Sequence, residues 1–121
     1  MNGPDWVRQL FQTIDRQDAD AFSTFLSDDA IFRFANAPVV AGKANVQKTV
    51  RTFLASIKGI HHDVLEAWEQ PGAVTCHGVV TYTRHDASTL TAFFANVFKM
   101  DGRLIKEYLI YVDASNLYAT T

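Results

Sequence analysis

One polar residue within an apolar strand pattern, Asn96, is the strongest chemical signal in the sequence. Alternate residues of a strand share a face, and residues 90–100 place Asn96 on a face that is otherwise apolar. The other members of that face are Leu90, Ala92, Phe94, Phe98 and Met100. An unpaired buried amide costs about 1–3 kcal/mol. We therefore expect Asn96 to bond either to a neighbouring segment or to a ligand.

The adjacent histidines His61 and His62 are candidates for proton transfer rather than for metal binding. Neighbouring residues of a strand point to opposite faces, so the two rings cannot coordinate the same metal ion, and no His-x-His spacing occurs. A neutral imidazole is a suitable base near pH 7. We favour His62 over His61 as the ring that enters a cavity; the alternative is a strand-entry histidine bonded to backbone or water. No metal and no cofactor are expected.

Two further polar residues could complete such a site. Tyr82 shares the predicted inward face of strand 73–85, and its hydroxyl needs either a ligand or a backbone partner. Asp113 is the one late acid that we keep as a catalytic candidate. Patterning favours Tyr108 and its face-mates Ile110 and Val112 inside, whereas a bulge would bring Asp113 inward. The run 84–86, Arg-His-Asp, is interpreted as a solvated hairpin end.

The elements that must position these residues are helices first and strands last. Apolar residues at helical spacing predict helices from Pro4 to about Gln17, from about 19 to 27, and from about 46 to a stop at Gly59. A strand is expected at 30–34, an irregular connection at 36–42, and long strands near 61–69, 73–85, 89–100 and 103–113. This order predicts an α+β domain whose sheet buries one face under the helices.

The bulk composition limits the class of protein. A chain of 121 residues with 48% hydrophobic content predicts a single domain, 1–121, and a formal net charge of -2 without a basic stripe argues against nucleic acid as a partner. No run approaches the ~18 apolar residues of a membrane span, so we expect a protein of the cytoplasm that does not bind membranes. Cys76, the one cysteine, is interpreted as a buried filler.

The opposite face of strand 89–100 carries apolar residues that would be exposed. Phe93 and Val97 lie there, and an exposed apolar patch on a small protein often marks a subunit interface. We therefore expect a homodimer formed through the outer face of the sheet.

The order of these elements resembles the nuclear transport factor 2 superfamily, specifically its SnoaL-like and ketosteroid-isomerase-like branch. The resembling stretches are IDRQDAD at 14–20, FLSDDA at 25–30, VAG at 40–42, VVTYTR at 79–84, VFKMDGRL at 97–104 and YVD at 111–113. The resemblance implies a cone-shaped, cystatin-like fold: three helices packed on a curved, mostly antiparallel sheet, open at one end to an apolar cavity. It also implies functions that range from catalysis to binding.

The resemblance also tests catalytic positions one by one. The general-base aspartate of ketosteroid isomerases falls on Phe34, their tyrosine on Leu10, and their second oxyanion donor on Asn96. A standard ketosteroid isomerase is therefore disfavoured. The Arg-x-Asp pair of the limonene-epoxide-hydrolase-like branch falls near Val80 and Tyr82.

Two functions follow as hypotheses. In the first, the cone binds a small, mostly apolar, oxygen-bearing ligand, with or without cofactor-independent acid/base catalysis of the isomerase, dehydratase or cyclase type. The expected ligand contacts are Asn96, Tyr82, His61, Phe34, Phe94, Phe98 and Trp68, with His62 and Asp113 as catalytic candidates. In the second, the chain is a non-catalytic binding or dimeric assembly domain.

Overall fold

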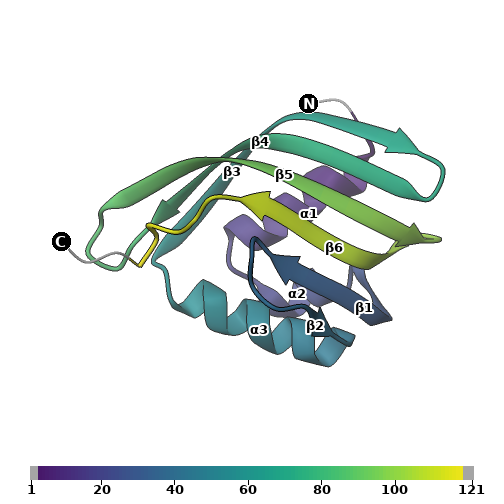
Figure 1. Cartoon of the computed structure of the whole chain (residues 1–121), viewed down its shortest axis with the longest axis horizontal. Coiled ribbons are helices and arrows are strands. Elements are labelled where there is room, and N and C mark those ends of the chain that lie inside the picture. The colour runs from purple at the N-terminus through teal and green to yellow at the C-terminus, as the bar shows by residue number, and fades with distance from the viewer. Residues whose placement is uncertain (1–2, 119–121) are drawn as a thin grey trace.

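Three helices and a six-stranded sheet make up the computed structural model, which describes residues 3–118 (Figure 1). The helices are α1 (Asp5–Asp15), α2 (Ala19–Ser23) and α3 (Lys43–Ala55). The strands are β1 (Leu26–Phe34), β2 (Val40–Ala41), β3 (Gly59–Gln70), β4 (Ala73–Thr83), β5 (Thr89–Asp101) and β6 (Leu104–Val112). The sheet order is β2-β1-β6-β5-β4-β3. All neighbouring strands are antiparallel except β1 and β6, which run parallel.

The helices form where the sequence supplies an apolar stripe and an end signal. Helix α1 buries one stripe, which contains Val7, Leu10, Phe11 and Ile14. Helix α2 is capped by the Asp18 carboxylate, which accepts a hydrogen bond from the Ala21 backbone N–H at 2.9 Å. Helix α1 agrees with the sequence prediction to within a few residues, whereas α2 ends earlier than predicted, because Leu26 and Ser27 already belong to β1.

Two local predictions were wrong. Gly59 does not stop α3, because the helix is capped at Ser56 and Gly59 is already the first residue of β3. The connection at 36–42 contains the short strand β2, whose residues Val40 and Ala41 pair with β1. Such a two-residue strand carries no periodic signal, so only its partner strand reveals it.

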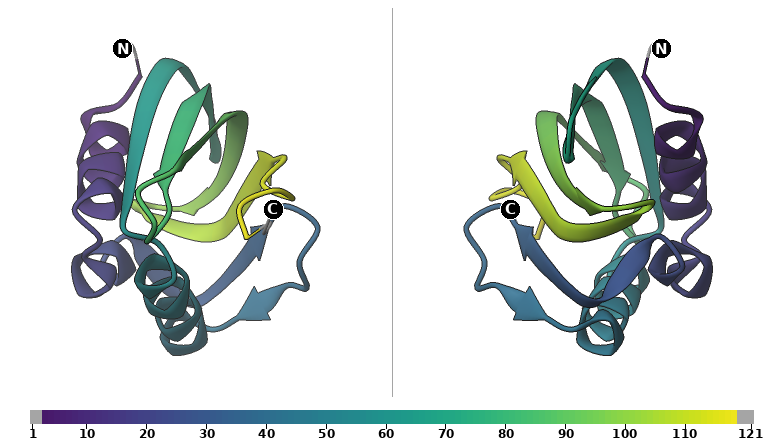
Figure 2. Two further views of the ribbon diagram at one scale, coloured as in Figure 1. Left: turned by 90° about the vertical axis from the view of Figure 1, so that its left-hand side faces the viewer. Right: turned by 90° about the vertical axis from the view of Figure 1, so that its right-hand side faces the viewer.

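The sheet curls around the helices, as Figure 2 shows. A β-bulge between Val64 and Glu66 shifts the register of β3 against β4 and adds local twist. Gly78 lies opposite this irregularity, and a Cβ atom at that position would lie 2.0 Å from the carbonyl oxygen of Asp63. The strong curvature therefore depends on a residue without a side chain.

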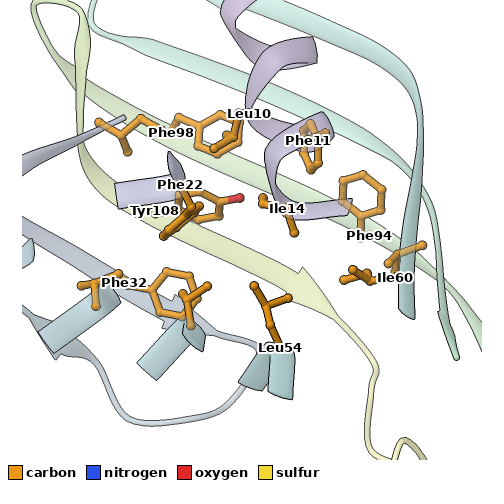
Figure 3. Packing of buried hydrophobic residues seen from close by; sticks show 14 of the residues in the cluster. Leu10, Phe11, Ile14, Phe22, Phe32, Leu54, Ile60, Phe94, Phe98 and Tyr108 are labelled. Atoms are coloured by element: carbon orange, nitrogen blue, oxygen red, sulfur yellow. The ribbon is translucent and has the colours of Figure 1, made fainter. Parts of the chain in front are cut away.

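The concave face of the sheet and the helices enclose the apolar core (Figure 3). Leu10 of α1 and Phe98 of β5 are fully buried, and Phe98 meets Tyr108 of β6 edge-on at 4.8 Å between ring centroids. Tyr82 and Asn96 also point inward, as the strand patterns predict. The last strand places Tyr108 inside, which confirms the inward set that patterning favoured. In the described part of the chain, no helix is long and apolar enough to cross a membrane.

Candidate functional site

A cavity of about 210 Å³ lies between the helices and the concave face of the sheet. Its wall is mainly apolar, with Phe22, Phe32, Phe34, Phe53 and Phe94 contributing aromatic rings. The remaining lining residues are Ile14, Ala37, Thr49, Val50, Leu54, Ile60, His62, Val80, Tyr82, Asn96, Tyr108 and Ile110. A small number of polar groups therefore faces an apolar space, which is the usual composition of a small-molecule site.

The side chain of His62 in β3 is held by Asp15, the last residue of α1. The Asp15 Oδ1 atom lies 2.6 Å from His62 Nδ1, and Asp15 Oδ2 accepts a hydrogen bond from the His62 backbone N–H at 3.0 Å. A carboxylate only accepts hydrogen bonds, so Nδ1 of the ring must carry a proton. When the ring is neutral, Nε2 therefore keeps its lone pair and can accept a proton.

Aromatic neighbours fix the orientation of the His62 ring. Its centroid lies 4.7 Å from that of Phe11 and 5.2 Å from that of Phe94, with the Phe94 ring perpendicular. The His62 side chain is 10% exposed. His62 Nε2 has no hydrogen-bond partner within residues 3–118, so this nitrogen is available to a ligand.

Asn96 is the second polar group of the cavity. The residue is 2% exposed, and its Oδ1 atom is buried without a hydrogen-bond partner in the described chain. Its cross-strand neighbours are Cys76 of β4 and Ile110 of β6. The sequence left open whether Asn96 bonds to a neighbouring segment or to a ligand. Its Oδ1 atom forms no bond to a neighbouring segment in the described chain.

Two tyrosines supply phenol groups to the same cavity. Burial raises the pKa of Tyr82 to about 12, with a smaller contribution from Tyr118. Burial also raises the pKa of Tyr108 well above 10, with smaller contributions from Cys76 and Asp15. Figure 3 shows the Tyr108 hydroxyl pointing toward Ile14 at the end of α1. Both phenols remain protonated at neutral pH, so they are hydrogen-bond donors.

The structure separates the remaining predicted site residues into two groups. Phe34 and Phe94 line the cavity, whereas Phe98, which we expected to contact the ligand, does not line it and packs against Trp6 with 5.4 Å between ring centroids. His61 points outward with a 75% exposed side chain, 3.6 Å from Asp15.

Beyond Phe98 and His61, which do not line the cavity, two further expectations need correction. Trp68 is half exposed and stacks on His77 at 5.5 Å on the outer face, because the bulge before Glu66 reverses the alternation of β3. Asp113 is exposed and accepts hydrogen bonds from Ser115, which hold its pKa below the usual range. Neither residue lines the cavity, and we do not retain either as a site residue.

The hairpin after β4 has a structural role. Arg84 Nε donates to the carbonyl oxygen of Leu117 at 2.8 Å, and its Nη2 donates to that of Asn116 at 2.9 Å. Asp86 accepts hydrogen bonds from Ser88, which lower its pKa. Arg84 therefore fastens the segment after β6, Asp86 holds the turn itself, and neither residue lines the cavity.

The sequence reasoning missed Asp15 and Tyr108 as members of the site. Asp15 lies four residues after Phe11 and eight after Val7, so it falls on the apolar stripe of α1, where a carboxylate requires a partner. That signal was present in the sequence. Tyr108 was placed inside by patterning, but nothing in its spacing distinguished it from a core residue.

The structure describes no group of three or more His, Cys, Asp or Glu side chains arranged for metal binding in residues 3–118. The polar groups that face or support the cavity are a carboxylate-oriented imidazole, an amide, two phenols and the hydroxyl of Thr49. Such a set can accept a proton and stabilise charge on oxygen, and each of these roles is open to protein side chains alone.

A cone-shaped α+β domain with an internal, mainly apolar cavity defines the class of this protein. The chain belongs to the SnoaL-like domain family, whose model matches residues 7–108. No curated protein sequence matches it.

Solved structures share the fold at low sequence identity. A hypothetical protein with a ketosteroid isomerase-like fold from Catenulispora acidiphila, in complex with trimethylamine, has a TM-score of 0.83 at 16% identity. That alignment covers 91% of this chain and 86% of the other. A candidate polyketide cyclase from Xanthomonas campestris pv. campestris has a TM-score of 0.81 at 18% identity, over 92% and 90% of the two chains.

An epoxide hydrolase from M. tuberculosis, described as LEH-like, has a TM-score of 0.78 at 15% identity, over 93% of this chain and 83% of that one. At these identities the likeness establishes the fold, which is NTF2-like and ketosteroid isomerase-like. The family model that matches residues 7–108 confirms the SnoaL-like family that the sequence motifs indicated.

Proposed function

We propose that the cavity binds a small, mostly apolar, oxygen-bearing molecule and that His62, oriented by Asp15, transfers a proton to or from it. The observation that carries this proposal is the 2.6 Å contact between Asp15 Oδ1 and His62 Nδ1, which leaves the other ring nitrogen as a base. The matching position for the family's usual base is Phe34, so the proton acceptor lies on a different strand from that of ketosteroid isomerases.

The other polar groups suit a reaction in which charge develops on oxygen. Tyr82 and Tyr108 can donate hydrogen bonds to an oxyanion, and the apolar wall strengthens such bonds by excluding water. The class that fits is cofactor-independent isomerisation, dehydration or cyclisation. A candidate polyketide cyclase and an epoxide hydrolase have folds similar to that of this chain, which supports small-molecule chemistry of this general kind.

Solvent deuterium exchange tests the proton transfer directly. A suitable probe is 5-hydroxy-1-indanone, whose carbon acid at C2 lies beside a carbonyl group. NMR in D₂O should show that the wild-type protein accelerates exchange at C2 and that His62→Gln loses at least about a hundredfold of that acceleration. Thr81→Val, which removes a hydroxyl group from the outer face of β4, is the matched control. Exchange that is equally fast with wild type and His62→Gln would overturn the catalytic role.

A second candidate function, dimeric assembly through the outer face of the sheet, has its own support. Phe93 is 83% exposed at the centre of β5, and Val97 lies on the same face. Phe93 pairs with Val79 of β4, and Val97 pairs with Thr75 of β4 and with Leu109 of β6. A ring this exposed, with Val79, Val97 and Leu109 near it on the same face, is typical of a surface that another chain covers.

The oligomeric state tests this second proposal. Sedimentation at micromolar concentration should give a dimer for wild type and a monomer for Phe93→Glu, because a buried carboxylate at the interface would lack a partner. A wild-type protein that sediments only as a monomer would contradict it. His61→Gln, which changes an exposed side chain of the edge strand β3, is the control and should remain dimeric.

A further inference from the structure

We propose that the ligand of the cavity is an uncharged molecule of one or two rings that forms a hydrogen bond, through a hydroxyl or N–H group, with the side-chain amide of Asn96. This inference rests on the proposed function and narrows it to a class of substrate. Three independent features of the cavity support it: its volume, its lack of fixed charge and its unpaired oxygen.

The volume limits the size of the ligand. An apolar protein cavity of about 150 Å³ accommodates benzene. The cavity here, about 210 Å³, is larger by roughly one third to one half, so it suits a ligand of roughly eight to twelve non-hydrogen atoms. Molecules with three or four fused rings do not fit without movement of the walls.

The lining limits the charge of the ligand. Within the described part of the chain, no Lys, Arg, Asp or Glu side chain lines the cavity. The nearest acidic group, Asp15, is already engaged by the ring and the backbone of His62. An ionised ligand would lose its hydration, and the lining residue that could supply a positive counter-charge, His62, is already paired with Asp15, so an uncharged ligand is favoured over a carboxylate or a phosphate ester.

The unpaired oxygen specifies the polar group of the ligand. Asn96 Oδ1 is a buried acceptor that no donor among residues 3–118 satisfies, although the residue is held between Cys76 and Ile110 in the middle of the sheet. A strand-centre side chain cannot swing out to solvent. A ligand hydroxyl or N–H group can pair with this amide, whereas a methyl group at the same point leaves it unpaired.

Titration calorimetry with a matched set of probes tests the inference. The set is 5-indanol, its isostere 5-methylindane, and indane-5-carboxylate. For the wild-type protein, 5-indanol should bind about tenfold more tightly than 5-methylindane, and the carboxylate should bind at least tenfold more weakly than 5-indanol. Equal affinities for 5-indanol and 5-methylindane, tighter binding of the carboxylate, or no binding of 5-indanol would each overturn the inference. These wild-type comparisons do not depend on any variant folding.

Variants then assign the preference to Asn96. Asn96→Leu removes the acceptor at nearly constant volume, so 5-methylindane should bind it at least as tightly as 5-indanol does. Thr49→Val, which removes a different hydroxyl from the lining, should keep the wild-type preference. A tenfold preference for 5-indanol that persists in Asn96→Leu would overturn the assignment.

His62→Gln separates this inference from the proposed catalysis. It should keep the preference for 5-indanol while losing acceleration of deuterium exchange. A wild-type protein with the preference but without catalysed exchange would contradict the proposed function alone, and exchange without the preference would contradict this inference alone.

Discussion

The replacement Asp15→Asn tests whether the carboxylate sets the proton position on His62. In the wild-type protein Asp15 accepts two hydrogen bonds from one residue, from Nδ1 at 2.6 Å and from the backbone N–H at 3.0 Å. An asparagine can keep only one of these as an acceptor. If its oxygen stays on the backbone N–H, its NH₂ group faces Nδ1, and the ring must move its proton to Nε2.

The hydrogen bonds of Asp15 set the expected loss of stability and the expected loss of catalysis. Hydrogen bonds to charged groups contribute about 1.5–3 kcal/mol and neutral ones about 0.5–1.5 kcal/mol. Replacing the charged acceptor by a neutral amide should therefore lower the free energy of unfolding by about 1–1.5 kcal/mol. For a domain of this size that corresponds to a fall in Tm of about 3–8 °C. Catalysed deuterium exchange should fall by at least about a hundredfold, since Nε2 could no longer accept a proton.

Long-range ¹H–¹⁵N correlation spectra of the histidine rings provide the assay. At a pH where the His62 ring is neutral, the wild-type protein should show a protonated Nδ1 and Asp15→Asn a protonated Nε2. His61→Gln is the matched control, because His61 Nδ1 lies 3.6 Å from the same carboxylate, and it should leave the His62 tautomer unchanged. A protonated Nε2 in wild type, or the same tautomer in wild type and Asp15→Asn, would refute the reasoning.

Three further predictions concern the surroundings of the cavity. Gly78→Ala should lower the free energy of unfolding by about 2–4 kcal/mol in denaturant titrations, because its Cβ would lie 2.0 Å from a backbone oxygen. Gly59→Ala is the control: its nearest contact would be at 3.6 Å, and it should change the free energy of unfolding by less than about 1 kcal/mol. An equal effect of both variants would contradict the close approach.

Burial raises the pKa of Tyr82 from 10.0 to about 12, so the unfolded chain releases this proton first as the pH rises. The stability contributed by Tyr82 is therefore complete below pH 10 and is lost between about pH 10 and 12, by up to about 3 kcal/mol. Tyr82→Phe should show a shallower loss over that range in denaturant titrations, and identical slopes would contradict the assignment. Burial likewise raises the pKa of Cys76 to about 12, so a thiol reagent at pH 8 should react with it only after unfolding, and rapid labelling of the folded protein would be inconsistent with that burial.

The sequence predicted most of the architecture because its signals are periodic. The alternation around Asn96 identified the concave face, and the apolar stripe of α1 identified the helix that covers it. Trp68 was misplaced because a bulge adds one residue to a strand, and a pattern of period two gives no warning of that insertion.

The site was harder to predict than the fold because its central contact joins distant residues. Asp15 and His62 are 47 positions apart, and each has an ordinary explanation in its own segment. His62 was selected by strand position, yet its orientation depends on a carboxylate at the end of α1. Only the docking of α1 beside β3 brings the two side chains together.

The parallel pairing of β1 with β6 has a consequence for the order of folding. Phe32 of β1 pairs with Tyr108 of β6, so the first strand of the chain cannot form this pairing until the last strand is present. Contacts so distant in sequence form late, because the loop that they close is long. During synthesis, β1 therefore emerges with an unpaired edge, and the cavity that includes Tyr108 exists only after β6 has docked. The step that completes the sheet is also the step that creates the binding space.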